Sequence, residues 1–229
     1  QGVTAGVLKD VSFVGSNKGF AVSDDGFILI TNDQGATWTK SFSNANALYG
    51  IYAKTSDVIF AMGEKGTMLR TKDGGANWET VSIPGLIEDL NAVAFINNAI
   101  GYGIGTNGTL IKTLDGGDTW TILDSGTPFD LESICFFASN LGYVSGKGGA
   151  ILKTTDGGAN WTMLDPSPKY AYYDIQALNN NLVYAVGDVG TLIKSIDGGT
   201  TWTSMKPADE SYLDVKRFHQ EINFPENGI

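Results

Sequence analysis

The sequence predicts an all-β protein made of five tandem units, and three observations support this prediction. A motif of the form Thr/Ser-x-Asp-Gly/Gln-Gly-x-Asn/Thr-Trp occurs five times, and its tryptophans are 40, 42, 41 and 41 residues apart. Short apolar runs with alternating polarity, typical of half-buried strands, recur in every unit. No helical periodicity competes with them before residue 203. Four antiparallel strands in about 41 residues are typical of one blade of a β-propeller.

The four strands of a unit follow from its residue pattern. An apolar-alternating strand comes first, as in Leu131, Ile134 and Phe136, and a shorter strand that often opens with Gly and an aromatic residue comes second. A third strand leads into the repeated motif, and the fourth begins at its Trp. We expect one domain over residues 1–229, with blades at approximately 8–47, 48–89, 90–130, 131–172 and 173–211.

Residues 212–229 resemble the opening strand of a sixth unit, but this segment contains no sixth copy of the repeated motif. Two alternatives remain open for it. Either a ring of five blades is closed by a tail, or the chain is the first part of a larger propeller. Since an open ring leaves a sheet face exposed, we favour a larger propeller that is completed elsewhere.

The repeated motif has the chemistry of a tight hairpin turn. Its Gly residues supply the positive φ angles that short turns between antiparallel strands need. Its carboxylate can accept backbone N–H groups of its own turn, and its Trp offers a large apolar face for packing between units. We therefore assign structural roles, without chemistry, to Asp33, Trp38, Asp73, Trp78, Asp115, Trp120, Asp156, Trp161, Asp197 and Trp202.

This motif resembles the Asp-box, also called the bacterial neuraminidase repeat. The longer pattern Gly-x-x-Gly-x-x-x-x-Thr-x-Asp-Gly-Gly-x-x-Trp is similar to that of the photosystem II stability/assembly factor family, and the resemblance covers nearly the whole chain. It implies a β-propeller with five complete Asp-box repeats plus a partial sixth. It also implies assembly or scaffold work by an exported protein, located in the periplasm, at the cell surface or outside the cell. A first residue other than Met fits that expectation.

Strand alternation divides the connections between two faces of the propeller. The Asp-box turns share one face with the turns between strands one and two, and the Gly-rich turns between strands two and three share the other with the linkers between blades. Binding residues concentrate on loops held by a rigid scaffold. We therefore predict a recognition surface on the linker face, with aromatic side chains for protein or glycan contacts: Phe129, Lys169, Tyr170, Tyr172 and Tyr173.

Composition argues against several classes of partner. The net charge of −10 and the pI near 4.4 disfavour nucleic acid and anionic membrane surfaces. No apolar stretch approaches the ~20 residues needed to span a bilayer, so we do not expect a membrane-embedded protein. With one cysteine (Cys135) and one histidine (His219), an intrachain disulfide and a His/Cys metal cluster are excluded. We expect no metal and no cofactor.

Enzymatic alternatives fail on residue counts. A sialidase-like glycoside hydrolase binds its substrate carboxylate with three arginines, and this chain has only Arg70 and Arg217. The same count excludes the arginine-rich patch through which the photosystem factors are thought to engage their client. A Ser–His–Asp hydrolase would depend on His219, which lies in the C-terminal tail, and the sequence contains no nucleophile-elbow motif.

A calcium site is a weaker alternative than solvated turns, because the candidate carboxylates belong to different blades: Asp24, Asp25, Glu64 and Asp188. The sequence therefore predicts a non-catalytic binding or scaffold propeller. A sialidase-like hydrolase and an assembly factor for a membrane or surface complex are the alternatives.

Overall fold

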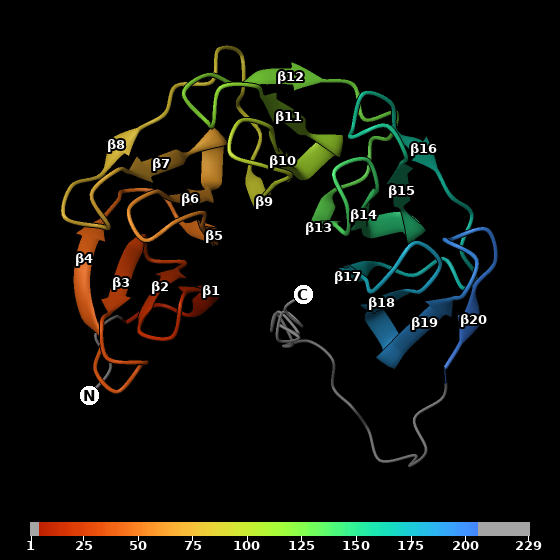
Figure 1. Cartoon of the computed structure of the whole chain (residues 1–229), viewed down its shortest axis with the longest axis horizontal. Coiled ribbons are helices and arrows are strands. Elements are labelled where there is room, and N and C mark those ends of the chain that lie inside the picture. The colour runs from red at the N-terminus through yellow and green to blue at the C-terminus, as the bar shows by residue number, and fades with distance from the viewer. Residues whose placement is uncertain (1–4, 206–229) are drawn as a thin grey trace.

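The computed structural model describes residues 5–205, which form five four-stranded antiparallel sheets arranged as blades along an arc (Figure 1). In each sheet the strands follow chain order from the inner to the outer edge of the arc. The all-β propeller architecture predicted from the sequence is confirmed. The arc is open, and its two ends are the first sheet (β1–β4) and the last sheet (β17–β20).

The strand bounds differ little between blades. Blade 1 contains β1 (Leu8–Val14), β2 (Lys18–Ser23), β3 (Phe27–Thr31) and β4 (Thr39–Ser43). Blade 2 contains β5 (Leu48–Ala53), β6 (Ile59–Gly63), β7 (Met68–Thr71) and β8 (Glu79–Thr80). Blade 3 contains β9 (Leu90–Phe95), β10 (Gly101–Gly105), β11 (Leu110–Thr113) and β12 (Thr121–Leu123). Blade 4 contains β13 (Leu131–Phe136), β14 (Gly142–Gly146), β15 (Ile151–Thr154) and β16 (Thr162–Met163). Blade 5 contains β17 (Tyr172–Ala177), β18 (Val183–Gly187), β19 (Thr191–Ser195) and β20 (Thr203–Ser204).

Blades 2 to 5 also carry a single 3₁₀ turn between their second and third strands. These turns are η1 (Glu64–Gly66), η2 (Thr106–Gly108), η3 (Lys147–Gly149) and η4 (Asp188–Gly190). Within residues 5–205 the chain has no helix long and apolar enough to cross a membrane. The segment 212–229, His219 and Arg217, all considered in the sequence analysis, lie outside the described residues.

The core lies between blades, as four apolar clusters. Between blades 2 and 3, for example, Phe60 and Met62 pack against Val93, Ile111 and Trp120. Three similar clusters join blade 1 to blade 2, blade 3 to blade 4, and blade 4 to blade 5. A single sheet cannot bury its apolar faces alone, so each face is buried by a neighbouring blade. Only a blade with a neighbour on both sides therefore buries both of its faces.

Each inner strand is interrupted by a register shift at the same place. In β1 the pairing with β2 passes from Leu8 to Asp10, and the other inner strands show the same shift one or two residues from their start. A β-bulge bends its strand and redirects a side chain. The bulged residues are Lys9, Tyr49, Asn91, Glu132 and Tyr173.

Candidate functional site

On the Asp-box face, the polar groups of each turn form hydrogen bonds with one another. In blade 3, Oδ1 of Asp115 accepts hydrogen bonds from Oγ1 of Thr113 (2.8 Å) and from the backbone N–H of Thr119 (2.9 Å), while the Thr119 hydroxyl donates to Oδ2 (2.5 Å). The N–H of Gly117 donates to Oγ1 of Thr113 at 2.9 Å. The other four boxes repeat this set of contacts, except that in blades 2 and 4 the side-chain amide of Asn77 or Asn160 replaces the hydroxyl as the donor to Oδ2.

These hydrogen bonds stabilise the charged form of each box carboxylate. Side-chain and then backbone donors of the same turn lower the pKa to about 2 for four of the five carboxylates: Asp33, Asp73, Asp156 and Asp197. The pKa of Asp115 is lowered further by Thr119. A general acid or base needs a pKa near the working pH, so these carboxylates are unsuited to proton transfer.

The box tryptophans connect neighbouring blades. Trp120 is almost completely buried, and its ring meets Phe60 of blade 2 edge-on, with centroids 6.2 Å apart. Its indole N–H donates to the carbonyl of Gly117 at 3.2 Å. Trp78 and Trp161 make similar edge-on contacts with aromatic rings of the preceding blades, Phe20 and Tyr102.

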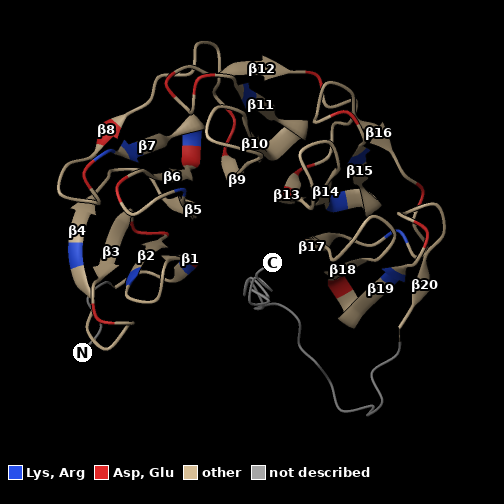
Figure 2. Cartoon of the chain, viewed as in Figure 1, with Lys and Arg blue, Asp and Glu red and all other residues tan. Residues whose placement is uncertain are grey.

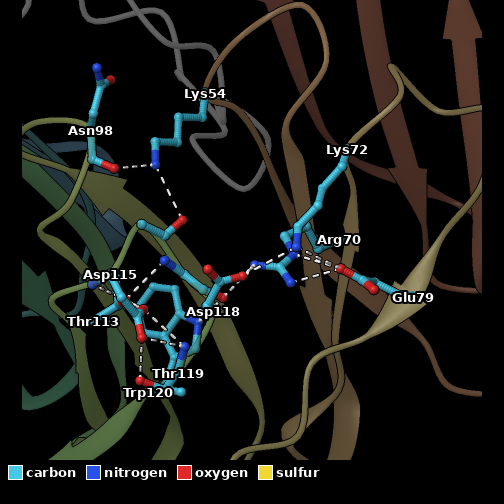
Figure 3. A network of polar contacts seen from close by, with 12 residues as sticks. Lys54, Arg70, Lys72, Glu79, Asn98, Thr113, Asp115, Asp118, Thr119 and Trp120 are labelled. Atoms are coloured by element: carbon cyan, nitrogen blue, oxygen red, sulfur yellow. Dashed lines mark hydrogen bonds and ion pairs between the residues drawn. The ribbon is translucent and has the colours of Figure 1, made fainter.

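Arg70 joins blades 2 and 3 through hydrogen bonds (Figure 3). Its buried guanidinium donates to Oε1 of Glu79 (2.7 Å), to Oδ1 of Asp118 (2.7 Å) and to the carbonyl of Gly117 (3.0 Å). Lys72 lies 3.2 Å from the same oxygen of Asp118. With its donors committed to blades 2 and 3, Arg70 is not available to bind a substrate carboxylate, which argues further against a sialidase-like site.

The linker face is held together by the 3₁₀ turns. Each turn donates a backbone N–H to the linker just before its own blade, as Lys147 does to the carbonyl of Asp130 (2.8 Å) and Asp188 to that of Ala171 (2.9 Å). Carboxylates of the linkers also bind the turn of the preceding blade: Oδ1 of Asp130 accepts the Asn107 N–H at 2.9 Å. The linker face is therefore a rigid surface that crosses blade boundaries.

Three of the predicted linker-face residues lie around η3 of blade 4. The ring of Phe129 covers Gly148, where an added Cβ would lie 2.7 Å from the ring, and 44% of Phe129 remains exposed. Lys169 packs on Gly149 and pairs with Asp165 at 2.7 Å. Tyr170 is exposed. These side chains are placed where a partner could reach them.

The remaining two predicted residues behave differently from each other. Tyr173 is half-buried, and its hydroxyl donates to Oδ1 of Asp188 in η4 at 2.8 Å. Tyr172 has no exposed surface, because it faces the core between blades 4 and 5, and its hydroxyl donates to the carbonyl of Pro168. Contrary to the prediction, Tyr172 therefore cannot contact a ligand. Alternation along β17 places only one of the two adjacent tyrosines on the outside.

A cavity of about 370 Å³ lies at the centre of the arc, lined by the inner strands of all five blades. Four of the bulged residues border it: Lys9, Tyr49, Asn91 and Glu132. Asp174, Gln176 and Cys135 also line it. Sequence reasoning missed this site, because the alternation of the first strands predicts which residues are half-buried but not that the inner strands of five blades face a common space.

The charges around this cavity and the neighbouring turns are mainly negative. Most acidic residues lie in the segments that connect strands (Figure 2). Burial, together with the nearby charges of Asp89 and Glu64, raises the pKa of Tyr49. The hydrogen bond to Asp188 raises the pKa of Tyr173. Desolvation raises the pKa of the Cys135 thiol to about 12, so this cysteine is not a nucleophile at neutral pH.

No group of three or more His, Cys, Asp or Glu side chains within residues 5–205 could hold a metal ion. Turn carboxylates considered for calcium serve local contacts instead. Asp24 accepts the N–H of Val7 at 2.7 Å, and Glu64 pairs with Lys65 at 2.7 Å.

Four-stranded blades that each carry an Asp-box turn identify this chain as an Asp-box β-propeller. The chain belongs to the family described as photosynthesis system II assembly factor YCF48, whose model matches residues 2–86 and 77–171. The match ends just before β17, although blade 5 carries the same box. No curated protein shows significant similarity to this chain.

Solved structures share the fold at low identity. A structure of YCF48 bound to a D1 peptide is 21% identical, with 88% of this chain and 82% of that chain covered and a TM-score of 0.50. Virginiamycin B lyase from Staphylococcus aureus is 13% identical over 89% of this chain and 71% of that chain, with a TM-score of 0.74. An ancestral GH74 enzyme is 17% identical over 90% of this chain and 32% of that chain, with a TM-score of 0.73.

Proposed function

We propose that this chain is a non-catalytic assembly or scaffold factor that binds a segment of a partner protein through its linker face. Membership of the YCF48 assembly-factor family carries this proposal. The solved relative with a bound D1 peptide is an example of a propeller of this family that binds a peptide.

The two faces of the arc support the choice of surface. On the Asp-box face, the box carboxylates accept hydrogen bonds from their own turns, and a Gly carbonyl accepts one from the neighbouring blade. Both faces expose large apolar side chains: Ile87, Phe129, Tyr170 and Val189 on the linker face are exposed by 76%, 44%, 43% and 82%, and Leu114 and Ile196 in the boxes by 67% and 70%. The choice of the linker face therefore rests on the polar groups that the boxes use internally and not on exposed apolar area. Exposed aromatic and aliphatic anchors on a fixed scaffold are typical of protein interfaces.

Site-specific photo-crosslinking tests this assignment. A photoreactive amino acid replaces Tyr170 on the linker face in one variant and Leu114 in an Asp-box in the other; Leu114 is the matched control because it is 67% exposed. Adducts with one defined partner from position 170, and not from position 114, are expected in cells that produce the protein. Adducts from position 114 alone would contradict the choice of face.

Partner affinity gives a second measurement. Tyr170→Ala should weaken binding of the identified partner by about tenfold, as removal of an interface anchor costs 1–2 kcal/mol. Leu114→Ala should leave it unchanged. Hydrolysis of a fluorogenic sialoside by the purified chain would instead support the enzymatic alternative, and binding to a glycan array without a protein partner would favour a carbohydrate ligand.

A further inference from the structure

Blades 2 to 5 each turn one backbone N–H group towards the central cavity, at the same level of their inner strands. Residues of an antiparallel pair alternate between those that bond to the partner strand and those whose N–H points away from it. Ile51, opposite Ala61, is of the second kind, because its N–H donates to Asp10 of blade 1. Val93 and Ile134 hold the same register position in blades 3 and 4. Their N–H groups therefore also point towards the cavity that both residues line.

In blades 1, 2 and 5, a carboxylate of the chain accepts the N–H group at this level. Oδ1 of Asp10 accepts the N–H of Val11 and Oδ2 accepts the N–H of Ile51, both at 2.8 Å, so one carboxylate bridges two blades. In blade 5, Oδ1 of Asp174 accepts the N–H of Ile175 at 2.9 Å. A carboxylate is thus the acceptor that the chain itself supplies here, and hydrogen bonds to an ionised acceptor are stronger than neutral ones.

The N–H groups of Val93 and Ile134 have no acceptor among residues 5–205. Where blade 1 has Asp10, blades 2 to 4 have Gly50, Ala92 and Ser133. The Ser133 hydroxyl donates to Oδ1 of Asp174 at 2.7 Å. Val93 and Ile134 are buried, with 6% and 9% of their surface exposed, and buried N–H groups are rarely left without a partner. Two adjacent blades therefore present a pair of donors suited to a carboxylate from outside the chain.

Negative charge lines the same cavity. Asp174 borders it, and no donor within the described part of the chain reaches Oδ2 of this carboxylate. Asp10 and Glu132 also line the cavity, and Lys9 is the one ammonium group that does so among the described residues. This excess of negative charge disfavours a ligand that has a carboxylate alone and favours one that also carries a positive charge. The volume of about 370 Å³ is typical of small-molecule sites.

We propose that the central cavity binds a free amino acid. Its carboxylate accepts the N–H groups of Val93 and Ile134, as the Asp10 carboxylate accepts those of Val11 and Ile51. Its ammonium group faces Oδ2 of Asp174. The site lies on the inner strands and not on the linker face, so the proposal is independent of the proposed function.

Titration of the ¹⁵N-labelled chain, followed by NMR at the amides of Val93 and Ile134, tests the site. The twenty protein amino acids are added in turn, and at least one should shift both amides in a saturable way. Acetate and methylammonium each carry one half of the ligand and should bind at least about tenfold more weakly than that amino acid, since each lacks a charge-assisted contact. The proposal would be overturned if no amino acid gave a saturable shift of these two amides, or if acetate bound as tightly.

Ala92→Asp fills the donor pair from within the chain. The new carboxylate stands where blade 1 has Asp10, so this variant should lose amino acid binding while its thermal unfolding midpoint stays the same or rises. Unchanged binding by a folded Ala92→Asp chain would contradict the assignment of Val93 and Ile134.

Asp174→Asn tests the other end of the ligand. The variant keeps an oxygen for the N–H of Ile175 but removes the charge, so it should weaken amino acid binding by about tenfold and leave acetate binding no weaker. Asp57→Asn, in the exposed turn between β5 and β6, is the matched control and should change neither. An equal loss of amino acid binding in both variants would reduce the effect to overall charge and overturn the role of Asp174.

Discussion

The Asp-box turns and the linker-side turns lie at opposite ends of the same sheets. Both contain residues with positive φ angles, and they differ in the hydrogen bonds that hold these residues in place. Each box places Gly at its second left-handed position, and the N–H of this Gly donates to the hydroxyl of the box Thr or Ser, which in turn donates to the box Asp. The linker-side turns of blades 2 to 5 also place Gly at their second left-handed position, but no carboxylate of their own bonds to the turn backbone, and the first left-handed position holds Lys65, Asn107, Gly148 or Val189. The boxes are therefore constrained at more positions than the linker-side turns, whose first left-handed residue varies between blades.

The comparison predicts that the largest loss of stability comes from a box residue packed between blades. Trp120→Ala removes a buried ring from the cluster of blades 2 and 3, and it should lower the free energy of unfolding by about 3–5 kcal/mol. Trp38→Ala is the control, because Trp38 is half-buried in the first blade and should cost less. Urea unfolding of both variants measures the difference, and equal losses would contradict the inter-blade role.

A single hydroxyl should account for part of the stability of a box. Thr113→Val keeps the shape of the buried side chain but leaves the N–H of Gly117 without its acceptor. An unsatisfied buried donor costs about 1–3 kcal/mol, so the urea midpoint should fall accordingly. Thr121→Val, at an exposed position of β12, should change it little.

The linker end should behave in the opposite way. Val189 is β-branched, has φ of 58° and is 82% exposed. A left-handed conformation is unfavourable for such a residue, so Val189→Gly should raise the free energy of unfolding by about 0.5–1 kcal/mol. If Val189 is a partner anchor, this variant gains stability and loses affinity. A loss of stability on thermal unfolding would show that Val189 is not strained.

The smallest effect per residue is expected from acid titration of the boxes. Their carboxylates are exposed, and hydrogen bonds lower the pKa of four of them to about 2, below the value of about 4 in an unfolded chain. A depressed folded pKa gives stability that is present above pH ~4 and is lost as the pH falls towards 2. The urea midpoint should therefore decline in this interval, with a shallower decline for Asp33→Asn. A flat profile would contradict the hydrogen-bonded geometry.

Much of the fold was predictable because its signals are local. The Gly residues and carboxylate of a box act within eight residues, and the strands between them alternate in polarity, so the repeat reveals the number, order and direction of the strands. The candidate site was less predictable. Tyr172 and Tyr173 are adjacent and chemically alike, and only the register of β17 separates a core residue from a surface residue.

The sequence by itself determined the tandem blades and their box turns, because those features depend on contacts between residues that are close in the chain. Only the tertiary structure decided what meets across blades: the burial of Arg70 between Glu79 and Asp118, the cavity bordered by five inner strands, and the open face of blade 5. The contact of Arg70 with Asp118, the cavity and the open face each depend on how residues of different units, about 40 or more positions apart, are placed in space, and a repeated pattern within one unit does not report this.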